Sequence, residues 1–132
     1  NNFEENIKAL IAENFYVEHL KWVDSYEDEI IKHDIHLFAL QLGTGTKGKV
    51  LCSMASGLIC VGNKYAFENI IVDDDLLINF KNENDFLDIL KNIDKNKKFY
   101  IKNALKIQKQ VIKNHSSERS AKIFWNKLKE FI

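Results

Sequence analysis

The chain has 132 residues, of which 45% are hydrophobic and 29% are charged, and 19 basic side chains balance 19 acidic ones. These values are typical of one globular domain, and no apolar run is long enough to cross a bilayer. The only cysteines are Cys52 and Cys60, which excludes a disulfide framework. We therefore expect a cytoplasmic protein without a secretory signal peptide.

The first third of the chain predicts a helix, a strand and a second, short helix. Four apolar residues fall on one helical face: Phe3, Ile7, Leu10 and Ile11. Their spacing predicts a helix over 3–13, and the aromatic and β-branched run over 16–23 predicts a strand. Asp24 or Ser25 is then suited to cap a short helix, with Asp28 three residues after Ser25.

The middle of the chain predicts a buried strand, a helix and another buried strand. Residues 35–40 are almost continuously apolar, as a strand covered on both faces by helices requires. Residues 49–56 follow as a helix that ends at Gly57, and residues 58–62 as the next strand.

The last part predicts a further short strand over 76–80 and three helices, over 84–93, 97–115 and 118–131. Ser116 or Ser117 is expected to cap the last helix. The alternation of strands and helices predicts an α/β fold, a Rossmann-like, doubly wound parallel sheet with about four strands and a helical C-terminus.

A glycine-rich loop joins the strand over 35–40 to the helix after it. Gly43, Gly45 and Gly48 fit the dinucleotide pattern G-x-G-x-x-G, and Lys47 and Lys49 add positive charge. Backbone N–H groups at a helix N-terminus attract anions, so the loop is suited to hold phosphate. The alternative is a plain strand-to-helix turn that contains several glycines.

A dinucleotide site also requires an acidic residue at the end of the next strand, where it binds the ribose hydroxyls. Here Asn63 and Lys64 follow that strand, and Glu68 lies beyond its end. We therefore set the dinucleotide interpretation aside.

Several motifs occur in the order found in one enzyme family. Asp34 and Ile35 match a strand that begins "D-I", and the segment "CSMASGLICV" is similar to "EAMA-x-G-x-PVV". Glu68 in "YAFENI" matches a loop glutamate that precedes a short "LLI" strand. Five residues match a loop of the form G-x-G-x-K-x-K-x-L: Gly43, Gly45, Lys47, Lys49 and Leu51. Together these motifs resemble the C-terminal, nucleotide-sugar-binding domain of GT-B glycosyltransferases of the large retaining group (group 1, family 4-like).

The resemblance implies transfer of a sugar from a nucleotide-diphosphate sugar to a glycan or lipid-linked acceptor, in bacterial cell-surface polysaccharide synthesis. It implies no obligatory metal or other cofactor. By the resemblance, Lys47 and Lys49 face the donor diphosphate, and Glu68 orients the sugar or the loop. Four loop residues would shape the cradle for the phosphates: Gly43, Thr44, Gly45 and Thr46.

Two positions depart from the family pattern. Many retaining members carry glutamates near the transferred sugar and at the ribose, where this chain has Thr44 and Cys52. Neither side chain supplies a carboxylate. Cys52 is interpreted as a packed helical residue and not as a nucleophile, because no histidine is placed to activate it. The alternative function is therefore a non-catalytic nucleotide-binding or assembly module of the same fold.

The resemblance also implies truncation, so residues 1–132 would form a partial donor-binding domain, inactive alone and without the N-terminal acceptor domain. The family's first strands would lie between the predicted strands over 16–23 and 35–40. We expect a homodimer or strand exchange to complete such a sheet.

The remaining polar clusters favour structural roles. His33 and His36 are too differently oriented for a metal site, and the acidic run from Asp73 to Asp75 is expected in a solvated loop.

The predicted helix over 97–115 combines lysines with apolar residues. Five lysines fall close to one face: Lys98, Lys102, Lys106, Lys109 and Lys113. Four apolar residues are expected on the opposite, packed face: Ile101, Leu105, Val111 and Ile112. The helix is interpreted as amphipathic and solvated, and the alternative is contact of its lysine face with the inner surface of a membrane. Nucleic-acid binding is not expected, because aromatic and basic residues do not alternate on a strand face.

Overall fold

The structure, a computed structural model, describes residues 2–13, 16–41 and 47–130. It confirms an α/β fold with a parallel sheet. The described part of the sheet has three strands in the order β1-β2-β3, namely β1 (Ile35–Phe38), β2 (Ile59–Gly62) and β3 (Ile78–Asn79). Ile35 pairs with Ile59 and Val61 pairs with Ile78, so β2 lies between β1 and β3.

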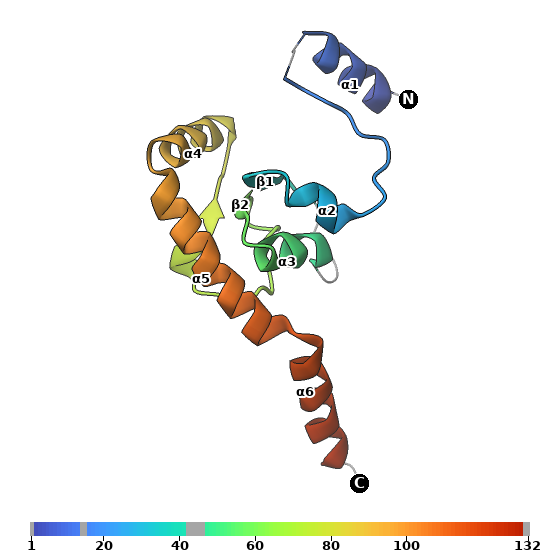
Figure 1. The fold of residues 1–132 in the computed structure, drawn as a ribbon, viewed down its shortest axis with the longest axis vertical. Coiled ribbons are helices and arrows are strands. Elements are labelled where there is room, and N and C mark those ends of the chain that lie inside the picture. Colours follow the sequence, from blue (N-terminus) through green and yellow to red (C-terminus); the bar gives the residue numbers. More distant parts are fainter. Residues whose placement is uncertain (1, 14–15, 42–46, 131–132) are drawn as a thin grey trace.

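Six α-helices lie in the described ranges, and Figure 1 shows α1 and α6 standing away from the sheet on opposite sides of the molecule. Their bounds are α1 (Asn2–Glu13), α2 (Tyr26–Ile30), α3 (Gly48–Ala55), α4 (Glu83–Lys95), α5 (Lys97–His115) and α6 (Ser117–Lys129). Each predicted helix is confirmed with small shifts of its ends. Within the described ranges, no helix has the length and apolar character needed to cross a bilayer.

The helix ends follow the capping residues of the sequence. Ser25 accepts a hydrogen bond from the N–H of Asp28 at 3.1 Å and so caps α2. Ser116 does the same for α6 by accepting from the N–H of Arg119. Gly57 follows α3 with a φ of +79°, a left-handed conformation that favours glycine.

The core has one cluster on each face of the sheet. On one face, Phe38 and Cys60 pack with α2, α3 and the second half of α5. Met54 of α3 lies in this cluster and is 1% exposed. On the other face, Ile59 and Val61 pack with α4 and the first half of α5. All four residues of β2 are buried, as the continuous apolar run of that strand predicts.

The predicted strand over 16–23 is wrong. These residues are irregular chain leading to α2, and Tyr16 and Trp22 are 100% and 83% exposed. Aromatic and β-branched residues favour a strand only where a neighbouring strand can pair with them. The described sheet therefore has three strands and not four, and β1 forms one of its edges.

The packed face of α5 also differs from its prediction. Ile101, Leu105 and Ile112 are 41%, 47% and 55% exposed, whereas Val111 is buried as expected. The other buried residues of α5 are Ala104 and Ile107. Packing on two sides selects this face, because Ile107 and Val111 belong to the core cluster that contains α3, whereas Ala104 belongs to the cluster with β2 and α4.

Gly62 at the end of β2 leaves room for the loop that follows. A methyl group at this position would lie 2.7 Å from Cβ of Ala66 and 3.0 Å from Cζ of Phe67. We expect Gly62→Ala to lower the free energy of unfolding by about 1–3 kcal/mol, because the loop must shift to admit it. Urea unfolding measures this change. Gly48→Ala is the matched control, since its added methyl meets no atom of the described residues within 4 Å. An equal loss of stability in both variants would contradict the steric explanation.

Candidate functional site

The carboxyl ends of the three strands meet at one edge of the sheet, where ligands of open α/β sheets usually bind. Backbone hydrogen bonds continue the sheet there, from the N–H of Asn63 to the carbonyl of Phe38 and from the N–H of Phe80 to that of Gly62. β1 ends at this edge, and α3 begins after residues 42–46, which the structure does not describe. The start of α3 and the loop after β2 therefore both lie at the carboxyl ends of the strands.

The start of α3 carries an excess of positive charge. Lys47 occupies the N-cap position without a side-chain capping bond, and the first turn contains no acidic residue. Lys47 is only 9% exposed, while Lys49 in the first turn is exposed. A helix N-terminus already bears a partial positive charge, so two cations there are unfavourable unless an anion offsets them. This arrangement is suited to bind a phosphate group.

The predicted cradle residues Gly43, Thr44, Gly45 and Thr46 lie outside the described residues. Of the predicted phosphate-facing residues, Lys47 begins α3 at the carboxyl edge. Lys49 lies beside α2, where its Nζ is 5.7 Å from the centre of the Tyr26 ring. A cation over an aromatic face is held only weakly at an exposed position, by about 0.5–1 kcal/mol, so Lys49 can turn toward an anion at small cost.

Glu68 lies in the loop after β2 and lines a hollow of about 370 Å³ at the ends of β2 and β3. Lys64 and Asn79 line the same hollow. Asn69 beside it has a φ of +65°, a conformation that asparagine tolerates better than most residues. No ion pair between described residues joins Glu68 to Lys47 or Lys49. Glu68 and Lys64 thus form a polar wall in the loop after β2, separate from the lysines of α3.

Cys52 packs as the sequence predicts. Its side chain is half-buried beside the core, and its Sγ lies 3.8 Å from Oε1 of Glu27 on α2. Burial raises the pKa of the thiol, and the Glu27 carboxylate raises it further. The thiolate, which is the nucleophilic form, is therefore disfavoured. The family pattern places a ribose-binding carboxylate at this position. Here the position holds Cys52, whose side chain contacts Glu27 of α2.

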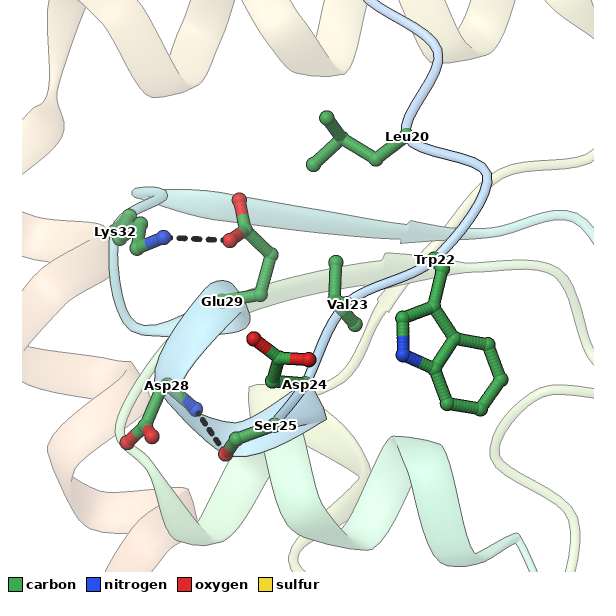
Figure 2. Close-up of a pocket in the computed structure, with 8 residues that line it drawn as sticks. All are labelled: Leu20, Trp22, Val23, Asp24, Ser25, Asp28, Glu29 and Lys32. Atoms are coloured by element: carbon green, nitrogen blue, oxygen red, sulfur yellow. Dashed lines mark hydrogen bonds and ion pairs between the residues drawn. The ribbon is translucent and has the colours of Figure 1, made fainter.

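A second hollow lies where the irregular chain enters α2, and Figure 2 shows it between that chain and the residues of α2. Its volume is about 560 Å³. Three carboxylates line it, from Asp24, Asp28 and Glu29, together with Lys32. Its negative charge disfavours a diphosphate, so it does not compete with the start of α3 as an anion site.

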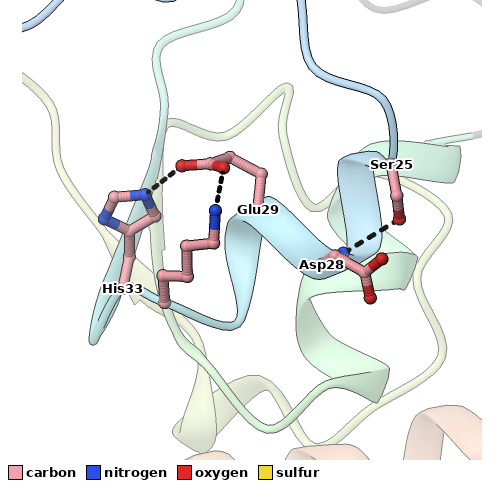
Figure 3. A network of polar contacts seen from close by, with 5 residues as sticks. Ser25, Asp28, Glu29 and His33 are labelled. Atoms are coloured by element: carbon pink, nitrogen blue, oxygen red, sulfur yellow. Dashed lines mark hydrogen bonds and ion pairs between the residues drawn. The ribbon is translucent and has the colours of Figure 1, made fainter.

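One of these carboxylates, that of Glu29, belongs to a local network of polar contacts shown in Figure 3. Lys32 donates to Glu29 at 2.6 Å, and Nε2 of His33 lies 3.5 Å from the same carboxylate. The hydrogen bond from Lys32 is the main cause of the lowered pKa of Glu29. The His33 ring is thereby directed to Glu29 of α2. Across the described ranges, no three His, Cys, Asp or Glu side chains cluster closely enough to hold a metal ion.

Comparisons with known proteins do not assign the chain to a family. No family model, curated protein or solved structure matches it. The functional proposal below therefore depends on the quoted motifs and on the geometry around α3.

A contact between His36 and Ser53 was not expected from the sequence, because the two residues are 17 positions apart. Nδ1 of His36 lies 2.6 Å from Oγ of Ser53, which in turn donates to the carbonyl of Lys49 at 3.0 Å. This distance suits a nucleophile and its base, but Ser53 is fully buried and has no access to substrate. The pair instead fastens α3 to β1. Tyr26 beside it has a buried hydroxyl that meets no hydrogen-bond partner among the described residues.

The His36 contact predicts a pH-dependent stability. Burial lowers the pKa of His36 below its ordinary value of 6.5, and repulsion from His33 and Lys49 lowers it further. As the pH falls through 6.5, the unfolded chain binds a proton that the folded chain excludes, so stability decreases. We expect the free energy of unfolding to drop between pH 7.5 and pH 5, and to drop less in His36→Leu. The difference is at most about 1.4 kcal/mol for each pH unit.

Urea unfolding of both proteins at the two pH values measures this effect. His19→Leu is the control, because His19 is exposed in the irregular chain before α2. An identical pH dependence in the wild type and His36→Leu would contradict the assignment.

Proposed function

We propose that this chain is the donor-binding part of a GT-B glycosyltransferase and holds the diphosphate of a nucleotide sugar at the start of α3. On this proposal, the three-stranded sheet is an incomplete, Rossmann-like donor domain, and the active enzyme includes an acceptor domain. The observation that carries the proposal is the charge at the start of α3, where the nearly enclosed Lys47 makes no side-chain capping bond and, with the exposed Lys49, adds positive charge to the helix dipole.

The chemistry of sugar transfer suits this arrangement. When the glycosidic bond of the donor breaks, negative charge develops on the leaving diphosphate. Fixed N–H groups and ammonium groups stabilise that charge more strongly in the transition state than in the bound donor. Lys47 would contact the phosphates from its enclosed position, and Lys49 would move from the Tyr26 ring to join it. Glu68 and Lys64 supply polar groups at the ends of β2 and β3, within a hollow suited to sugar hydroxyls.

A non-catalytic nucleotide-binding module is the second candidate. The observation that favours it is the contact of Cys52 with Glu27. Cys52 occupies the position of the ribose-binding glutamate of the family, and its thiol supplies no carboxylate to a bound ribose. Such a module would retain the diphosphate site and lack preference for the sugar.

Titration calorimetry with UDP and GDP tests the proposal, with uridine and guanosine as controls that lack phosphate. We expect heat of binding with at least one diphosphate and none with the nucleosides. Absence of heat with both diphosphates would overturn the proposal. Competition by UDP-glucose and GDP-mannose distinguishes the two candidates, because only a donor site should prefer the nucleotide sugar to the free diphosphate.

A further inference from the structure

Charge is strongly divided along the chain. Residues 97–132 contain ten basic and two acidic side chains, whereas residues 1–96 contain nine basic and seventeen acidic ones. Residues 97–132, which contain the last two helices, thus carry a net charge of +8 against −8 for the remainder. Every lysine of α5 is exposed, and so are its apolar residues Phe99, Ile101, Leu105 and Ile112. This surface attracts anions and also presents apolar groups.

α6 has an apolar stripe that no other described element covers. Figure 1 shows α6 leaving the sheet beyond the end of α5, and α5 is its only substantial neighbour among the described elements. None of its residues is buried, and Phe124 and Trp125 are 68% and 54% exposed. The stripe follows helical spacing and consists of Ala121, Phe124, Trp125 and Leu128. Two large aromatic side chains in water are unfavourable, so the stripe favours an apolar environment.

Basic residues border this stripe. Lys122 and Lys129 lie beside it on one side of the helix and Lys127 on the other, and Nζ of Lys129 is 5.6 Å from the centre of the Trp125 ring. Lysine stems can cover apolar surface while their ammonium groups reach the polar boundary. A helix with Trp, Phe and Leu on one face and lysines around them is typical of helices that lie in a membrane interface.

A hollow of about 400 Å³ at the corner between α5 and α6 adds a third basic feature. Lys113 of α5 and Arg119 and Lys122 of α6 line it, together with the apolar Ile123 and the acidic Glu118. By helical spacing, Arg119, Ile123 and Asn126 lie on the side of α6 opposite the apolar stripe, so the hollow adds positive charge to the corner between α5 and α6 without facing the same surface as the stripe.

We propose that α6 and the basic surface of α5 bind an anionic phospholipid bilayer, with the apolar stripe of α6 entering the interface. Charge complementarity favours this occupant over a second copy of the chain, because two copies would bring equal positive charges together. The stripe favours it over a nucleic acid, since Ala121 and Leu128 offer nothing to a base edge or phosphate. The acidic remainder would face away from the bilayer, which orients the molecule. The proposal does not depend on glycosyltransferase activity.

The test uses Trp125 as a reporter in the full chain carrying Trp22→Phe, since the chain has only two tryptophans. Vesicles of phosphatidylcholine alone are compared with vesicles containing about one third phosphatidylglycerol. With the anionic vesicles we expect a blue shift of Trp125 emission and quenching by brominated acyl chains. Raising the salt to 0.5 M should weaken binding, because salt screens surface charge.

Two variants separate charge from insertion. Lys122→Gln/Lys127→Gln should weaken partitioning onto anionic vesicles about 25-fold, since each lysine near such a surface contributes roughly fivefold. Lys81→Gln/Lys91→Gln, which removes two exposed lysines outside α5 and α6, is the matched control and should bind normally. Phe124→Ser should weaken binding roughly tenfold and leave its salt dependence unchanged. Circular dichroism verifies that each variant is folded.

Four results would overturn the proposal. The first is equal binding to neutral and anionic vesicles, and the second is vesicle binding without a change in Trp125 emission. The third is an equal loss of binding in the control variant and in Lys122→Gln/Lys127→Gln. The fourth is a shift of Trp125 emission caused by dimerisation or by duplex DNA in the absence of lipid.

Discussion

Lys47→Gln is expected to weaken the binding of UDP or GDP about 10- to 100-fold, because one charge-assisted hydrogen bond contributes about 1.5–3 kcal/mol. Glutamine retains part of the packed stem of the enclosed lysine and removes its charge. Titration calorimetry measures the loss. Lys49→Ala should also weaken binding, by a smaller factor, because Lys49 is exposed and must first leave the Tyr26 ring.

The stability of Lys47→Gln provides a second, independent readout. Without a ligand, removal of a positive charge from the N-terminus of α3 should leave the free energy of unfolding unchanged or raise it by about 0.3–1 kcal/mol. Lys91→Gln, at an exposed position on α4, is the control and should alter neither affinity nor stability. Loss of stability together with loss of binding would instead indicate a merely structural lysine.

Met54→Ala is expected to lower the free energy of unfolding by about 2–5 kcal/mol, the largest effect of any substitution considered for this chain. Met54 lies on α3, is 1% exposed and belongs to the core cluster that joins α3 to the second half of α5. Truncation leaves a cavity between the two helices. Gln108 of α5 donates to the carbonyl of Ala55 at 2.8 Å, so the helices cannot easily close the gap.

Urea unfolding checks this expectation, with Ile31→Ala as the control. Ile31 follows α2 and is 61% exposed, so its truncation should alter stability by no more than about 0.5 kcal/mol. Similar losses in the two variants would show that the α3–α5 contact contributes little.

Features encoded by neighbouring residues were predictable from the sequence. The apolar run from Ile35 and the buried residues of β2 indicated parallel strands, and Ser25 and Gly57 marked helix ends that the structure confirms. In each case the cause lies within a few residues of the feature, as burial on both faces, a capping hydroxyl or a left-handed turn.

Features that depend on distant partners were not predictable. Residues 16–23 have strand-like composition, but no strand lies beside them in the described sheet, and Trp22 remains exposed. Either face of α5 offered apolar residues, and contact with α3 decided between them. The pairing of His36 with Ser53 likewise required the helix and the strand to be placed in space.

The number of residues that separate two contacting side chains indicates an order of folding. The contact from Asn63 to Leu40 at the ends of β1 and β2 spans 23 residues, whereas that from Gln108 to Ala55 spans 53. Closing the longer loop costs only about 0.7 kcal/mol more in chain entropy. We therefore expect the unit of β1, α3 and β2 to form the nucleus, and α5 to dock on it with a small further entropic barrier. Residues 35–62 contain two lysines and no acidic residue, and α5 is also basic, so we expect repulsion between the nucleus and α5 to slow this docking at low salt and added salt to speed it.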